Sequence, residues 1–243
     1  MFQNGSYPTL GRDAMLLILT WAAGTVDAIS YLGLGHVFTA MMTGNTVLLG
    51  LALAQGELLA AGRSALALLG FAMGVVLGAM IVERDDAEAE WPPSVSRAFV
   101  LEAAILALFA ALWFWSGSSR GAHSLHALIV VLGAAMGLQA AAVRRLDVPG
   151  IATTYITGTI THLFVDVVGW SRAADVPAGA SGEPIKWEQR VGLLAGVLFV
   201  YGFGALCGGL LQVHWQVLAC VAPLIAVAVV VVNAYMRYGS RRW

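Results

Sequence analysis

The sequence predicts an all-α polytopic membrane protein with six full transmembrane helices, two re-entrant or broken half-helices and two inverted structural repeats. Three observations support this prediction. The 243 residues are 59% hydrophobic and only 11% charged, whereas a soluble domain is about 25% charged. The abundance of glycine, with 28 residues against 7 prolines, suits helices that pack closely in lipid. Two Thr-Gly triplets interrupt apolar segments at matching places in the two halves of the chain.

Long uncharged stretches locate the six full spans, because about 20 apolar residues are needed to cross a bilayer. Residues 191–236 contain no Asp, Glu, Lys or Arg over 46 positions. We expect this stretch to hold two helices joined by a hairpin near residues 212–216. The four single spans are expected at 14–34, 64–82, 99–115 and 125–143.

Two further apolar segments, 37–54 and 151–168, each open with a polar, Thr-rich portion. Lys and Arg are enriched in short cytoplasmic loops, so their distribution tests whether these segments cross the membrane. If all eight segments cross with the N-terminus inside, nine basic residues lie inside and four outside. If the two polar-headed segments enter and return, the count becomes eleven against two. The second arrangement is favoured, with both termini cytoplasmic.

An internal repeat agrees with this topology. Residues 38–46 align with 152–160, and 71–79 resemble 201–209 in the spacing of their glycines. A single membrane domain, 1–243, then divides into repeats of about 1–120 and 121–243, the second inverted relative to the first. Chance recurrence of small residues in apolar helices is the alternative. The matched pairs are Thr39 and Thr153, Thr43 and Thr157, Gly44 and Gly158, and, with a one-residue gap, Gly24 and Gly137.

The two triplets predict a substrate site near the membrane midplane. Glycine permits unusual backbone angles, and Thr and Asn side chains cap helices or bind ligands. Two opposed helix N-termini would form a partly positive locus for an anionic group. The alternative is that these side chains only bond neighbouring helices. The expected site residues are Thr43, Gly44, Asn45, Thr46, Gln139, Thr157, Gly158 and Thr159.

Asp27 and His162 are the candidates for proton coupling or for tuning the charge of the site. Asp27 lies well within the first span, where ionisable groups are usually functional. A structural role, capping the region of residues 43–46 or remaining protonated in the core, is the alternative. His162 precedes Asp166 by four residues, a spacing that places both on one helical face, and a His–carboxylate pair is suited to relaying a proton. Asp166 itself is expected to be a solvated surface charge, and Glu102 is expected near a membrane interface.

Several functions are not predicted. The net charge of −1 and the scattered basic residues offer no nucleic-acid footprint. Cys207 and Cys220 supply neither a disulfide framework nor a metal site, and no cofactor is expected. The chain has no GxxxxGK[ST] motif and no recognisable nucleophile–base pair, so neither nucleotide-driven transport nor an enzyme is predicted. Closely spaced glycines at 70/74/78, 133/137 and 192/196 predict tight helix packing or a homodimer.

The stretches 24–56, with its Val-Asp-Ala and Met-Thr-Gly-Asn-Thr, and 144–163, with Thr-Thr-Tyr-x-Thr-Gly-Thr, resemble the YoaK family of bacterial membrane proteins. The resemblance covers nearly the whole chain and implies a six-span inner-membrane protein without an established substrate. One departure is that the family's Gln-Asn pair before "VRRL" is replaced by Gln139-Ala140-Ala141. More loosely, the motif plan is similar to inverted-repeat transporters of sulfate-type anions and nucleobases.

Together these observations predict a secondary transporter of a small anionic or weak-acid metabolite, coupled to protons, in the bacterial inner membrane. Its partners would be the lipid bilayer, the small-molecule substrate and, as an open alternative, a second copy of the chain. The competing hypothesis is a non-transporting membrane sensor or partner protein that assembles through its glycine-rich helix faces.

Overall fold

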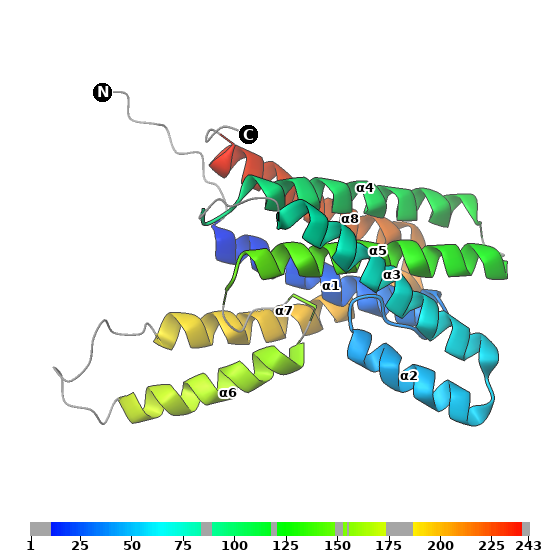
Figure 1. Ribbon diagram of the computed structural model, residues 1–243, viewed down its shortest axis with the longest axis horizontal. Coiled ribbons are helices and arrows are strands. Elements are labelled where there is room, and N and C mark those ends of the chain that lie inside the picture. The colour runs from blue at the N-terminus through cyan, green and yellow to red at the C-terminus, as the bar shows by residue number, and fades with distance from the viewer. Residues whose placement is uncertain are drawn as a thin grey trace.

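A computed structural model describes residues 11–83, 89–117, 121–148, 153–154, 156–173 and 187–239. This part of the chain forms eight α-helices and no strand (Figure 1). Their bounds are α1 (Arg12–Gly33), α2 (Met42–Gln55), α3 (Leu58–Val82), α4 (Pro93–Trp115), α5 (Ala122–Arg145), α6 (Ile156–Ala173), α7 (Trp187–His214) and α8 (Gln216–Tyr238).

Six of these helices, α1, α3, α4, α5, α7 and α8, are long and apolar enough to cross a membrane. The prediction of an all-helical protein with six candidate spans is therefore confirmed. The expected hairpin within 191–236 is a break at Trp215, between α7 and α8. The helices begin earlier than predicted, because the sequence criterion ended each span at a charged residue and a helix continues through it. α3, for example, includes Arg63.

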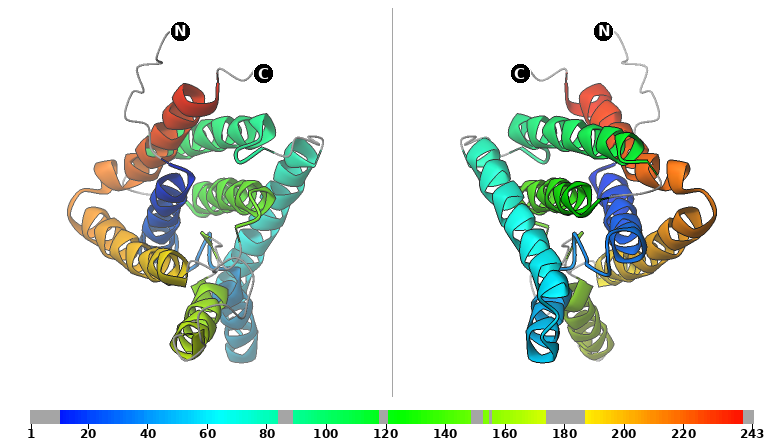
Figure 2. Two further views of the ribbon diagram at one scale, coloured as in Figure 1. Left: turned by 90° about the vertical axis from the view of Figure 1, so that its left-hand side faces the viewer. Right: turned by 90° about the vertical axis from the view of Figure 1, so that its right-hand side faces the viewer.

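The centre of the bundle is occupied by α1 and α5, which are the most buried of the six long helices. Figure 2 shows the other long helices arranged around them. α1 packs against α7 and α8, whereas α5 packs against α3 and α4, and α4 also contacts α8. The outward faces of the surrounding helices carry exposed apolar side chains, such as Leu69, Met73 and Val76 of α3. Such a surface is suited to lipid.

Glycines allow two helix pairs to approach closely. A Cβ atom on Gly74 of α3 would overlap the carbonyl of Ala134 in α5, and one on Gly137 would overlap the carbonyl of Phe71. In the other pair, a Cβ on Gly204 of α7 would overlap the carbonyl of Trp21 in α1. The glycine spacing therefore predicts close packing correctly at 70/74/78 and 133/137. At 192/196 the approach is looser: a Cβ on Gly196 would lie 3.6 Å from Leu17 Cδ2 of α1, whereas one on Gly192 would meet no described atom within 4 Å.

The short helices α2 and α6 differ from the long ones in where they start. Both begin near the middle of the long axis of the molecule and run outward in opposite directions (Figure 1). α2 has 14 residues, and α6 has 18. α2 packs against α3 and α6 packs against α7, but no Cα atom of α2 lies within 8 Å of a Cα atom of α6.

The turn after α1 directs the chain back toward the centre. Gly35 and His36 both have positive φ angles, 82° and 63°. Such angles are uncommon for residues other than glycine. The backbone N–H of His36 bonds to the carbonyl of Tyr31 at 3.1 Å, which closes the end of the helix. The chain then returns through residues 37–41 to the start of α2.

Candidate functional site

The buried polar site forms where the returning chain meets α1. The Oδ1 atom of Asp27 accepts hydrogen bonds from the backbone N–H groups of Thr39 at 2.9 Å, Ala40 at 2.7 Å and Met41 at 3.3 Å. These three residues immediately precede α2. Because helix N-termini carry free N–H groups and a partial positive charge, a carboxylate is favoured in this position. The side chain of Asp27 thus holds the start of α2 against the middle of α1.

The second oxygen of this carboxylate has a partner from the other half of the chain. The hydroxyl of Tyr201, on α7, donates a hydrogen bond to Oδ2 of Asp27. Asp27 is only 4% exposed. A carboxylate this deeply buried requires several donors to offset the loss of water. Three backbone N–H groups and one phenol provide them.

Asn45 fixes the same segment from within α2. Its Oδ1 atom accepts the backbone N–H of Phe38 at 2.9 Å, and its Nδ2 atom donates to the carbonyl of Phe38. The side chain is fully buried. The amide therefore satisfies both backbone polar groups of Phe38, which lies in the irregular segment before α2. Asn is suited to this role because it offers a donor and an acceptor side by side.

The remaining residues of the first triplet lie differently. Thr43 and Thr46 are exposed, and the hydroxyl of Thr46 donates to the carbonyl of Met42 at 3.1 Å within its own helix. Gly44 lies under the ring of Phe38, where a Cβ atom would come within 2.9 Å of Phe38 Cδ2. Two faces are therefore present at the start of α2: Asn45 points inward, and the two threonines point outward.

Gln139 of α5 is the corresponding buried group in the second half. Its Nε2 atom donates to the hydroxyl of Thr153 at 2.9 Å and to the carbonyl of Leu19 in α1 at 3.2 Å. Gln139 is fully buried, and its Oε1 atom has no hydrogen-bonding partner within the described residues. The second half thus pairs a neutral amide with Thr153, where the first half pairs a carboxylate with Thr39.

The second triplet repeats the two-faced pattern. Thr157 is exposed, Gly158 is half-buried and Thr159 is buried at 1% exposure. The hydroxyl of Thr161 donates to the carbonyl of Thr157 at 3.0 Å. The alternation of an exposed and a buried polar residue around a glycine is therefore common to α2 and α6.

His162 and Asp166 of α6 have different surroundings, although they are four residues apart. His162 is exposed. Asp166 is 5% exposed and forms an ion pair with Arg190 of α7, Oδ2 to Nε 2.7 Å. The expectation that Asp166 is a solvated surface charge is wrong, because α6 packs against α7 and brings the carboxylate onto Arg190. The predicted position of Glu102 is also wrong, since the structure buries it fully near the middle of α4.

The predicted site residues are thus grouped in two clusters. Asp27 and Asn45 meet around residues 38–41, and Gln139 meets Thr153 near the start of α6. The two triplets lie in different clusters, since no Cα atom of α2 is within 8 Å of a Cα atom of α6. Tyr201 was missed by the sequence analysis. The signal for it was the aligned position Phe71, which differs from Tyr201 by the hydroxyl alone.

This arrangement defines a polytopic helical membrane protein with buried polar groups at the starts of two short internal helices. A family model described as "Protein of unknown function (DUF1275)" matches residues 15–233, and the chain belongs to this family. It is also similar to the UPF0700 transmembrane protein YoaK of Bacillus subtilis (strain 168). The two are 42% identical over 158 residues, which cover 65% of this chain and 68% of that relative. The predicted resemblance to the YoaK family is therefore confirmed. No solved structure matches the chain significantly.

Proposed function

We propose that this protein is a secondary transporter of a small anionic or weak-acid metabolite, coupled to protons, in the bacterial inner membrane. The observation that carries the proposal is the buried cluster of Asp27, Tyr201 and the N–H groups of residues 39–41 at the start of α2. Ionisable groups at this depth are costly, and in transporters they mark the route of substrate or ions. Broken helices that begin near the midplane are a recurrent feature of transporter sites.

In this proposal α2 and α6 are re-entrant half-helices. Irregular backbone is tolerated at membrane depth only where protein or water satisfies its polar groups. Asp27 and Asn45 satisfy residues 38–41 in this way. The length of α2, 14 residues, is also short for a full crossing.

The proposal also treats the two halves as inverted repeats. The sequence alignment pairs Gly24 with Gly137 and Phe71 with Tyr201. A Cβ on Gly24 would overlap the carbonyl of Tyr201, and one on Gly137 would overlap the carbonyl of Phe71. The first helix of each half is thus packed on the third helix of the other half. Two repeats related by a pseudo-two-fold axis would produce this reciprocal packing.

The polar groups beside the starts of α2 and α6 differ in charge, and this difference indicates where an acidic substrate would bind. At α2 the position of an anion is already occupied by Asp27. At α6 the neighbouring group is the neutral Gln139, whose Oε1 atom is free within the described residues. We therefore place the acid group of the substrate near Gln139, Thr157 and Thr159. In its protonated form the acid would donate its O–H to Oε1. Asp27, and His162 on α6, would tune the charge or carry the coupled proton.

Uptake of labelled weak acids into proteoliposomes tests the proposal. Candidates are first selected by thermal stabilisation of the purified protein. We expect uptake that rises as the external pH falls, and a loss of that pH dependence in Asp27→Asn. Gln139→Leu should weaken binding of the same acid. Uptake that ignores pH and is unchanged in Asp27→Asn would remove the coupling role. Failure of every acid either to stabilise the protein or to be taken up would contradict the transporter.

The alternative is a sensor or partner protein that assembles through glycine-rich faces. The glycines at 70, 74, 78, 133 and 137 all face other helices of the same chain. These faces are therefore already used, and a partner or a second copy would have to bind elsewhere. For this reason we favour the transporter.

A further inference from the structure

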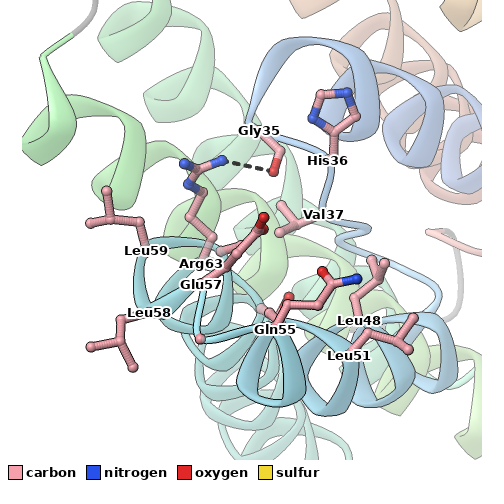
Figure 3. Close-up of a pocket in the computed structure, with 14 residues that line it drawn as sticks. Gly35, His36, Val37, Leu48, Leu51, Gln55, Glu57, Leu58, Leu59 and Arg63 are labelled. Carbon is pink, nitrogen blue, oxygen red and sulfur yellow. Dashed lines mark hydrogen bonds between the residues drawn. The ribbon is translucent and has the colours of Figure 1, made fainter.

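A pocket separate from the polar clusters lies at the outer end of α2. It has a volume of about 710 Å³, within the roughly 300–1,000 Å³ of small-molecule sites. Its walls come from the turn after α1, the second half of α2 and the start of α3 (Figure 3). Five polar side chains line it: His36, Gln55, Glu57, Arg63 and Ser64.

Arg63 is held in a defined position on the pocket wall. Its Nη1 atom donates to the carbonyl of Gly35 at 3.1 Å. A Cβ atom on Gly35 would lie 2.9 Å from Arg63 Cδ, and the φ of Gly35 is 82°. Glycine therefore suits this position, because a larger residue would be strained by the positive φ and would displace the side chain of Arg63. A guanidinium has five N–H donors, and the bond to Gly35 is the one that Arg63 makes within the described residues.

Glu57 supplies the opposite charge without neutralising Arg63. It stands at the N-cap position of α3, but its side chain makes no capping hydrogen bond. Glu57 and Arg63 both line the pocket but do not form an ion pair with each other (Figure 3). The pocket thus presents a cation and an anion, each with unused hydrogen-bonding capacity.

The rest of the lining is apolar and opens outward. Leu51, Leu58 and Leu59 line the pocket and are 53%, 75% and 71% exposed. A ligand with an apolar portion would gain free energy by covering them. The pocket therefore combines a dipolar head site with an apolar margin.

We propose that this pocket binds a zwitterionic group, with an anionic oxygen group on the guanidinium of Arg63 and an ammonium on the carboxylate of Glu57. Arginine matches carboxylate and phosphate through paired N–H donors. Two sources carry this chemistry: the headgroup of phosphatidylethanolamine, whose acyl chains would lie over the leucines, and a free amino acid or phosphoethanolamine. The proposal does not depend on transport.

The test measures thermal stabilisation of the full-length protein in detergent by dilauroyl phosphatidylethanolamine, dilauroyl phosphatidylglycerol, phosphoethanolamine or glycine. For the wild type we expect phosphatidylethanolamine to stabilise more than phosphatidylglycerol, which lacks the ammonium. Arg63→Gln and Glu57→Gln should each raise the half-maximal concentration about tenfold, because each removes a charge-assisted hydrogen bond. Arg12→Gln, at the opposite end of α1, is the matched control and should respond like the wild type.

Each outcome bears on the proposal. Equal responses of the wild type, Arg63→Gln and Glu57→Gln would overturn it. Equal stabilisation by the two lipids would overturn the ammonium site on Glu57. Stabilisation by phosphoethanolamine or glycine with the same dependence on both residues would support the site and identify a soluble ligand. Glu57→Gln removes no hydrogen bond of the described structure, so it remains informative if Arg63→Gln fails to fold.

Discussion

Asp27 solves a local problem of backbone chemistry. The chain reverses direction between α1 and α2, and the N–H groups of residues 39–41 have no helical partner there. One carboxylate oxygen satisfies all three, and Tyr201 satisfies the other oxygen. The bonds of Asp27 to residues 39–41 thus agree with the structural alternative, in which its side chain caps the start of α2. A functional role would have to act through the same bonds.

Removing these bonds one at a time should destabilise the protein in a fixed order. Tyr201→Phe removes one donor to a buried carboxylate, a loss of about 1.5–3 kcal/mol. Asp27→Ala should cost more, because it leaves three N–H groups without an acceptor. Thermal unfolding in detergent measures both. Tyr31→Phe is the matched control, since that hydroxyl has no partner within the described residues. A Tyr201→Phe midpoint equal to that of Tyr31→Phe would contradict the importance of this bond.

Glu102 is the reverse case, a buried carboxyl without a partner. It is fully buried in α4, and neither oxygen has a hydrogen-bonding partner within the described residues. Because an unsatisfied buried polar group costs about 1–3 kcal/mol, Glu102→Met should raise the thermal midpoint. Gln139→Met is the comparison and should lower it, since Gln139 donates two hydrogen bonds. A fall in stability for Glu102→Met would mean that the carboxyl has a role other than packing.

At the scale of the elements, helix pairing depends on a few glycines. Gly204 faces the backbone of Trp21 in α1, whereas a Cβ on Gly202, two residues earlier on α7, would meet no described atom within 4 Å. The same substitution at these two positions therefore separates packing from helix propensity.

Gly204→Val should separate α7 from α1 and lower the thermal midpoint strongly, because the added atoms meet backbone that cannot move aside. Gly202→Val points its side chain toward lipid and should have little effect. Folded yield in membranes and thermal unfolding in detergent measure the difference. Similar values for the two variants would show that the α1–α7 contact does not need a glycine.

The helices themselves were largely predictable from the sequence, but their partners were not. Hydropathy identified the long helices, because a membrane span must be apolar along its whole length. The break at Trp215 followed from length alone, since 46 uncharged residues are too many for one span. By contrast, the bond between Asp27 and Tyr201 joins positions 174 residues apart. The pairing of Asp166 with Arg190 similarly depends on how α6 lies on α7. No local pattern encodes either contact.

At the scale of the whole molecule, the central question is which segments cross the membrane. Single cysteines in place of Asp13, before the core of α1, and Glu57, after α2, give a direct answer. Both positions are exposed. The native Cys207 and Cys220 are first replaced by serine.

If α2 is re-entrant, one crossing separates the two positions, and a membrane-impermeant thiol reagent should label Asp13→Cys and Glu57→Cys from opposite sides. The charge count further predicts that Asp13→Cys is cytoplasmic. A cysteine at Glu83, after α3, serves as the control and should share the side of Asp13→Cys. Labelling of Asp13→Cys and Glu57→Cys from the same side would require a full crossing by α2.

The close contact of α1 with α7 also has a consequence for how the protein is made. The ribosome completes Asp27 174 residues before Tyr201, about 10–35 s earlier at usual rates of synthesis. During this interval α1 lacks both its closest neighbour and the phenol that shares its carboxylate. Before α7 emerges, the carboxylate of Asp27 has the N–H groups of residues 39–41 as donors but lacks the hydroxyl of Tyr201. Formation of the α1–α7 contact is therefore a late step of biogenesis, and Asp27 acquires its last hydrogen-bond donor only at that step.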